Sequence, residues 1–343
     1  MKKKNKAIYL LFLMPFVYFA TACFVVWLVK TSGIYPSGSD TMYHVYRGDY
    51  VYNAIKSGNW YPLYDPAWYN GVGILRYWAP FPAYVMAFCQ YLAGGSQFGA
   101  YLFYIGGVCF LGACVWPFIG RGFNRPYLGA FIGLLWFFMP NNLCAIFIEG
   151  NLARSLSMIF LPVFIYSVYK YLYNHKLRYI PLMVFTFLLM ELCHLGYAGM
   201  VAIAVIIYGI VYMIQKGRKK AVLDVVISMI FGFMLLGIWL VASLRGGITS
   251  LDNSENMANF FQNLWITINP FERLTRGFEY FYFGFATLIV IVFGILFGYK
   301  KSRTGFVTGF IILLMTTKSA YAVLKHLPGS QYLWMLRFIS IAL

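Results

Sequence analysis

The sequence predicts an all-α integral membrane protein. Of its 343 residues, 61% are hydrophobic and only 11% are charged, and the mean hydropathy is +0.70. No soluble domain of this length buries so large a share of apolar side chains. The net charge of +17 comes from lysines and arginines that punctuate apolar runs. Cytoplasmic loop residues have this pattern, so the composition does not indicate nucleic acid as a partner.

Apolar length places about nine spans in a single transmembrane domain over residues 1–343. They are expected at residues 8–29, 99–120, 127–147, 155–173, 179–194, 197–214, 221–243, 280–298 and 304–320. Lysines precede the first span, which is typical of an uncleaved signal anchor with a cytoplasmic N-terminus. Because the sequence stops within an apolar run, we expect it to be the N-terminal portion of a longer chain.

Residues 30–98 are expected to form a large outer loop that contains interfacial helices. Within it, residues 79–93 have too few apolar side chains to span and carry two prolines near their start. If this segment spanned, Arg121 and Arg125 would fall outside, against the positive-inside rule. In the resulting arrangement most of the acids lie on the outer side, which is where we expect the polar chemistry.

The densest polar stretch of the outer loop contains Asp40, His44, Arg47 and Asp49. A helix that begins near Asp40 would place Asp40, His44 and Arg47 at positions i, i+4 and i+7, on one face. A carboxylate beside an imidazole and a guanidinium suits proton transfer and anion binding. The competing interpretation is that Asp40 only caps an interfacial helix.

A short outer turn between two expected spans holds Glu149, Asn151 and Arg154. Such groups are costly beside a membrane unless they are solvated or paired. An ordinary ion pair between Glu149 and Arg154 is the alternative to a functional role. The mixed-charge loop at 244–279 would become relevant if a phosphate were bound nearby.

Two further polar positions lie within or beside apolar runs. His194 follows Glu191 at the outer end of a span, and a lone histidine at a helix end is more often a structural hydrogen-bonding group than a catalyst. Arg337 lies in the last apolar run, where a phosphate or an acid would be its partner. The six cysteines lack metal-site spacing and the four histidines are scattered, so a zinc site is not indicated.

Several short motifs, spread over nearly the whole chain, resemble one family of bacterial polytopic membrane proteins. They are Gly38-Ser-Asp40 with His44 and Arg47, Ser57–Pro62, Tyr69–Gly73, Glu149-Gly-Asn151, Leu161-Pro162, His194, Leu327-Pro328 with Gln331, and Arg337-Phe338. The family is labelled 6-pyruvoyl-tetrahydropterin synthase-related, and its members look like GT-C lipid-sugar-dependent glycosyltransferases. The resemblance implies a GT-C-like multi-span bundle in the bacterial plasma membrane.

This resemblance also implies a reaction and a set of site residues. A sugar would move from a polyprenyl-phosphate donor to a glycan, lipid or protein acceptor of the cell envelope. Asp40 matches the essential first-loop acid, as a base or as a ligand of Mg²⁺ or Mn²⁺, with His44 sharing the proton and Glu149 as a second acid. The acid pairs of some GT-C families are not reproduced at Asp40, which leaves a metal requirement open. The expected substrate-binding residues are Arg47, Asp49, Trp60, Tyr61, Asn151, Arg154, His194 and Arg337.

Three other functions are alternatives to sugar transfer. Pterin synthesis is rejected because the zinc-binding histidines of the soluble pterin enzyme are missing. A transporter or flippase of a lipid-linked glycan would need charges buried at mid-membrane and broken helices. A non-catalytic membrane assembly protein would use the polar cluster as a partner surface, and Asp40 would then be dispensable.

Overall fold

The computed structural model describes residues 2–36, 38–68, 70–245, 264–269, 283–326 and 335–342. No strand occurs in these ranges, where one isolated antiparallel bridge joins Asp65 to Val72. Some positions of the expected motifs lie outside the described residues. They are Tyr69, Leu327, Pro328, Gln331 and most of the loop at 244–279.

Four helices are long and apolar enough to cross a membrane. They belong to α1 (Lys2–Ser32), α5 (Gln97–Gly122), α8 (Leu152–Asn174) and α10 (Leu195–Lys216). Their bounds agree with four of the expected spans, and the prediction of an all-α integral membrane protein is confirmed.

Three further helix pairs are apolar but broken. The first is α6 (Pro126–Leu135) with η1 (Trp136–Phe138), followed by α7 (Pro140–Leu143) with η2 (Cys144–Ile148), at a bend of 44°. The second is α11 (Lys219–Leu235) with α12 (Gly237–Arg245), at 61°. The third joins the second half of α15 (Gly284–Met315) to α16 (Lys318–Leu324), at 91°.

Counting each broken pair as one span gives up to seven candidate spans among the described residues. Two shorter apolar helices, α9 (Tyr179–Cys193) and Thr287–Tyr299 within α15, fall below spanning length. Residue 302 has non-helical backbone angles, so α15 consists of two helices that meet at a kink. The full set of nine spans stays a prediction.

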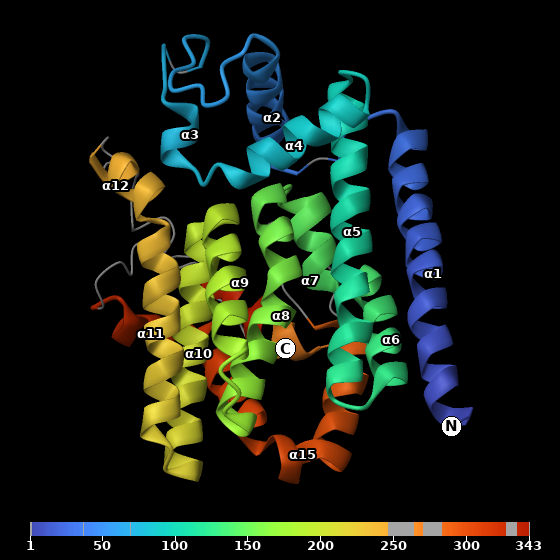
Figure 1. Ribbon diagram of the computed structural model, residues 1–343, viewed down its shortest axis with the longest axis vertical. Coiled ribbons are helices and arrows are strands. Elements are labelled where there is room, and N and C mark those ends of the chain that lie inside the picture. The colour runs from blue at the N-terminus through green and yellow to red at the C-terminus, as the bar shows by residue number, and fades with distance from the viewer. Residues whose placement is uncertain are drawn as a thin grey trace.

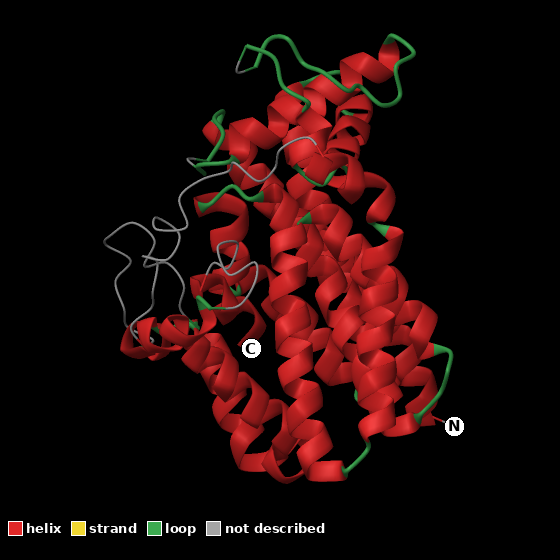
Figure 2. Cartoon of the chain, turned by 90° about the vertical axis from the view of Figure 1, so that its left-hand side faces the viewer, coloured by secondary structure: helices red, strands yellow, loops and turns green. Residues whose placement is uncertain are grey.

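The expected interfacial segment forms three helices at one end of the bundle (Figures 1 and 2). They are α2 (Thr41–Lys56), α3 (Ile74–Tyr77) and α4 (Phe81–Leu92). The 12 residues of α4 reach about 18 Å at 1.5 Å per residue. That is too short for a hydrocarbon core of about 30 Å. The N-terminus lies at the opposite end of the bundle (Figure 1).

Helix α8 forms the centre of the bundle and packs against α5, α9, α10 and η2. Its limits follow from local chemistry: Asn151 caps its first turn through a side-chain oxygen, and His175 ends it in a left-handed conformation. His194 caps α10 in the same way as Asn151 caps α8, and Gly217 ends α10 with φ of 68°. Such caps satisfy backbone groups that a helix end leaves unpaired.

The remaining described elements lie near the end of the chain. They are α14 (Leu264–Ile268), η5 (Met335–Phe338) and α17 (Ile339–Ala342). Both η5 and α17 pack on α15, and this packing brings the last described residues into the interior of the bundle.

Candidate functional site

The first polar stretch of the outer loop lies directly against the turn between η2 and α8. The backbone N–H of Asp40 donates to the carbonyl of Glu149 over 3.0 Å, and the Ser39 hydroxyl donates to the same carbonyl over 3.0 Å. A Cβ on Gly38 would lie 2.6 Å from the Gly150 backbone, so only glycine permits this approach. The structure thus brings the polar stretch that contains Asp40 against the turn that contains Glu149, although Ser39 and Glu149 are 110 residues apart.

Glu149 is the acid of a buried ion network that joins this turn to the end of the chain. Its Oε2 lies 2.8 Å from Nη2 of Arg154 and 3.6 Å from Nη2 of Arg337. Arg154 is 0% exposed, Arg337 7% and Glu149 8%. An ordinary surface pair would be solvated, whereas here one carboxylate faces two guanidinium groups away from water.

Asp40 precedes α2 but its side chain makes no capping hydrogen bond with that helix. Instead, its Oδ1 lies 3.3 Å from the Ser39 hydroxyl, whose one hydrogen it shares with the Glu149 carbonyl. Burial raises the pKa of the Asp40 carboxyl above its ordinary value, and the positive charge of Arg337 opposes that rise. Helix capping therefore does not account for this carboxylate, which is half-buried and within electrostatic reach of Arg154 and Arg337.

His44 and Arg47 lie on the buried side of α2. The Arg47 guanidinium donates to the carbonyls of Trp78 and Ala79, over 3.3 and 3.4 Å, and lies over the Trp78 ring. It therefore joins α2 to the segment before α4. Burial, and then the charge of Arg47, lower the pKa of His44 to about 3. At neutral pH His44 is an uncharged imidazole.

Three expected substrate-binding residues lie on the outer loop and its helices. Asp49 accepts a hydrogen bond from the Gln90 side chain over 2.6 Å. Trp60 is 71% exposed and Tyr61 46%. None of the hydrogen bonds or ion pairs found in the described residues joins these three to the Glu149 network.

Asn151 and His194 lie together at the start of two long helices. The Asn151 Oδ1 accepts from the Arg154 backbone N–H over 2.9 Å, and the His194 Nδ1 accepts from the Tyr197 N–H over 3.1 Å. The Asn151 Nδ2 is 3.4 Å from the His194 Nε2. Asn151 is buried, whereas His194 keeps part of its surface exposed.

Sequence reasoning missed residues that hold these parts in place. The Tyr104 hydroxyl donates to the Leu152 carbonyl over 2.9 Å, and Gln90 orients Asp49. Asp65 is buried in the outer loop, where it accepts from the Tyr46 hydroxyl over 2.6 Å. A tyrosine or glutamine within an apolar run has no distinctive pattern, so the sequence offers no signal for the first two.

A divalent metal at Asp40 was expected as one option. Within the described residues, no three or more His, Cys, Asp or Glu side chains gather as a metal site. The nearby Glu149 carboxylate already contacts Arg154 and Arg337. The described residues therefore offer no site built from protein ligands alone, and a Mg²⁺ ion held by Asp40 together with a substrate phosphate stays a prediction.

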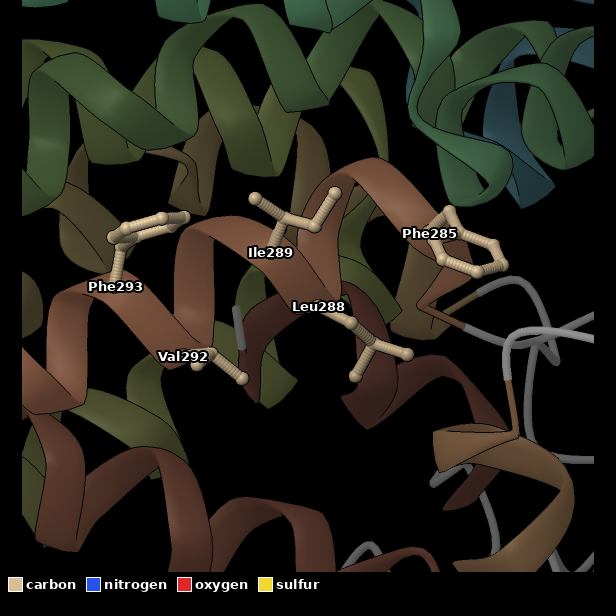
Figure 3. Close-up of a pocket in the computed structure, with 5 residues that line it drawn as sticks. All are labelled: Phe285, Leu288, Ile289, Val292 and Phe293. Atoms are coloured by element: carbon tan, nitrogen blue, oxygen red, sulfur yellow. The ribbon is translucent and has the colours of Figure 1, made fainter.

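An apolar pocket lies on the first half of α15, apart from the polar cluster. Figure 3 shows its lining side chains, which all belong to this one helix: Phe285, Leu288, Ile289, Val292 and Phe293. A hollow without polar groups suits contact with lipid chains rather than chemistry. We therefore place the candidate site at the Asp40–Glu149 junction.

The helices and the buried ion network define this protein as a polytopic membrane protein. The chain belongs to the family described as "6-pyruvoyl-tetrahydropterin synthase related domain; membrane protein", which matches residues 75–343. This range contains Glu149, Asn151, Arg154, His194 and Arg337, and it begins after Asp40. The predicted family is thereby confirmed, although its description assigns no reaction to the membrane domain.

One curated relative is an uncharacterized protein of Lactococcus lactis subsp. cremoris (strain MG1363). It is 20% identical over 323 residues, which cover 86% of this chain and 50% of the relative. The chain therefore spans about half the length of that protein. No solved structure is a significant match.

Proposed function

We propose that this protein is a GT-C-like glycosyltransferase that moves a sugar from a polyprenyl-phosphate donor to a cell-envelope acceptor. The observation that carries the proposal is the placement of Asp40. Its carboxylate makes no capping bond, is half-buried, and lies within electrostatic reach of Arg154 and Arg337. A base beside cationic groups is what transfer from a lipid phosphate requires.

In the proposed reaction, an acceptor hydroxyl oxygen attacks the anomeric carbon of the sugar. Its proton passes to Asp40, and the bond between the anomeric carbon and the phosphate oxygen breaks. The raised pKa of Asp40 makes it a stronger base than an exposed aspartate. Positive charge from Arg154 and Arg337 would stabilise the departing phosphate. Exposed Trp60 and Tyr61 on the outer loop offer rings for sugar stacking.

The proposed orientation places α2, α3 and α4 outside the bacterial plasma membrane and the N-terminus in the cytoplasm. The last turn of α5 and the loops after α8 and α10 carry arginine and lysine, among them Arg121, Lys176 and Arg218. The N-terminus and the turns after these helices lie at the end of the bundle opposite α2–α4 (Figure 1). This distribution of positive charge supports a cytoplasmic location for that end.

Complementation of a depleted strain tests the proposed activity. Mass spectrometry would first identify the lipid-linked sugar that accumulates when the protein is depleted. Asp40→Asn should insert normally yet lower transfer by about 10²-fold or more, the range for loss of a general base. Asp224→Asn is the matched control, because Asp224 lies in the second turn of α11, at the opposite end of the bundle, and accepts a hydrogen bond from the Tyr171 hydroxyl. A normal lipid profile in the Asp40→Asn strain would refute the proposal.

Transport of a lipid-linked glycan is a second candidate, favoured by the three broken helix pairs and by Glu191. This α9 residue is 1% exposed, and a Cβ added to Gly232 of α11 would lie 3.8 Å from its Oε2. Buried acids beside interrupted helices are typical of transporters. If Glu191→Gln does not complement the depleted strain while Asp40→Asn does, the result would favour transport.

A further inference from the structure

The contact between Asn151 and His194 joins two hydrogen-bond donors. A backbone N–H can only donate, so the Arg154 N–H identifies the Asn151 atom that it meets as the oxygen. The other amide atom, Nδ2, then carries two hydrogens. In the same way, the Tyr197 N–H donates to the His194 Nδ1, so a neutral ring carries its proton on Nε2. Nδ2 and Nε2, 3.4 Å apart, both carry hydrogens.

The opposite tautomer of His194 would still leave two hydrogen-bond donors facing each other, but at Tyr197 instead of Asn151. With the proton on Nδ1, His194 could accept from Asn151, but two N–H groups would then face each other at Tyr197. The Tyr197 contact is the shorter of the two, at 3.1 Å, and it caps the first turn of a 22-residue helix. Loss of a cap is unfavourable for a helix, so the Nε2–H tautomer is favoured.

The two donors lie where two helix N-termini meet. Asn151 caps α8 and His194 caps α10, helices of 23 and 22 residues. The two helices pack together and run in the same direction, since α9 runs back between them (Figure 1). Each N-terminus carries about half a positive charge. Arg337 and Arg154 also act electrostatically on the His194 ring.

We infer that Asn151 Nδ2 and His194 Nε2 donate together to one phosphoryl oxygen at the junction of α8 and α10. One acceptor oxygen has lone pairs for both N–H groups, and the surrounding potential favours an anion over a neutral oxygen. Asn151 is 5% exposed, so its donor cannot turn to bulk water. This assignment rests on the proposed function for its substrate, the phosphate of a lipid carrier.

Histidine NMR on the full chain in a maltoside detergent tests this inference without a measurement of activity. With four histidines in the chain, ¹⁵N-histidine labelling gives few signals, and His194→Asn assigns the relevant one. The unliganded protein should show His194 as the Nε2–H tautomer. Polyprenyl monophosphate should shift the Nε2 and Hε2 resonances, whereas the matching polyprenol should not. A shift with inorganic phosphate alone would show that the donors recognise the free ion too.

Asn151→Asp separates the donor from the helix cap. Aspartate still caps α8, but it replaces the amide donor by an acceptor for the His194 Nε2–H. We expect at least tenfold weaker binding of polyprenyl monophosphate, because hydrogen bonds to charged groups are the stronger kind. The Hε2 resonance should also move before any phosphate is added. Ser96→Asp at the start of α5, where Ser96 caps through Gly99, is the matched control and should bind normally.

Three results would overturn the inference: an Nδ1–H tautomer, no shift with either phosphate probe, or an equal shift with polyprenol. The outcome is separable from that for sugar transfer. If Asp40→Asn is inactive and the His194 resonances do not shift with phosphate, the proposed reaction stands and the phosphate site is refuted. If the His194 resonances shift and Asp40→Asn is fully active, the phosphate site stands and the proposed reaction is refuted.

Discussion

Neutralising Glu149 should destabilise the protein strongly, because it leaves two buried arginines without their shared carboxylate. In Glu149→Gln the side chain keeps its shape and a hydrogen-bond acceptor but loses its charge. Arg154 is fully buried and Arg337 nearly so. Both guanidinium groups would then lie beside a neutral amide, and a buried charge is costly without its counter-charge.

The size of the effect follows from the two N–O distances, 2.8 Å to Arg154 and 3.6 Å to Arg337. At an effective dielectric constant of about 20, unit charges at these distances attract by about 6 and about 5 kcal/mol. Desolvation offsets much of this attraction in the intact network. Removing one partner of a buried pair therefore has a net cost of about 3–5 kcal/mol.

Thermal unfolding in detergent, followed with a thiol-reactive dye, measures this loss. Cys144 and Cys193 are buried and become reactive on unfolding, while exposed Cys23 is first replaced by serine. We expect the Tm of Glu149→Gln to fall by at least about 5 °C.

Asp65→Asn is the matched control for this measurement. Asp65 is a buried acid that bonds Tyr46 and the Ala67 N–H, and no ion pair of Asp65 occurs in the described part of the chain. Its neutralisation should therefore have a smaller effect than Glu149→Gln. A Tm for Glu149→Gln within about 1 °C of the parent, or above that of Asp65→Asn, would refute the reasoning.

Two further predictions concern pH and topology. Because the pKa of His44 is lowered to about 3, the unfolded chain binds a proton below about pH 6.5 that the folded protein does not. Stability should then fall between about pH 6.5 and 3, by up to about 1.4 kcal/mol per pH unit, and His44→Asn should flatten the slope. The raised pKa of Asp40 has the opposite effect on stability at pH values just above the ordinary pKa of an aspartate. The stability of His44→Asn is therefore compared with that of its parent in an Asp40→Asn background. An unchanged slope of stability against pH would contradict the lowered pKa of His44. For topology, Ser57→Cys should react with an impermeant maleimide on intact cells and Lys176→Cys should not, both at exposed positions; the reverse pattern would invert the proposed orientation.

The helices themselves were largely predictable from the sequence. Apolar length located α1, α5, α8 and α10, because a chain in a bilayer must satisfy its backbone groups within each helix. The shortness of the segment with Pro80 and Pro82 predicted α4 as a non-spanning helix. The breaks after η1 and at Leu236 were not anticipated. A bend there changes neither hydropathy nor charge, and those are the properties that locate a span.

The candidate site shows what the sequence determined and what only tertiary structure decided. The sequence determined which polar groups are costly beside a membrane, and so it singled out Asp40, Glu149, Asn151, His194 and Arg337. Only the fold decided that Gly38 lies on Gly150, that Arg337 reaches Glu149, and that two helix caps bring Asn151 to His194. These contacts join segments 43 to 188 residues apart, and no local pattern encodes such a distance. They arise because buried charges and donors must find partners once the helices have packed.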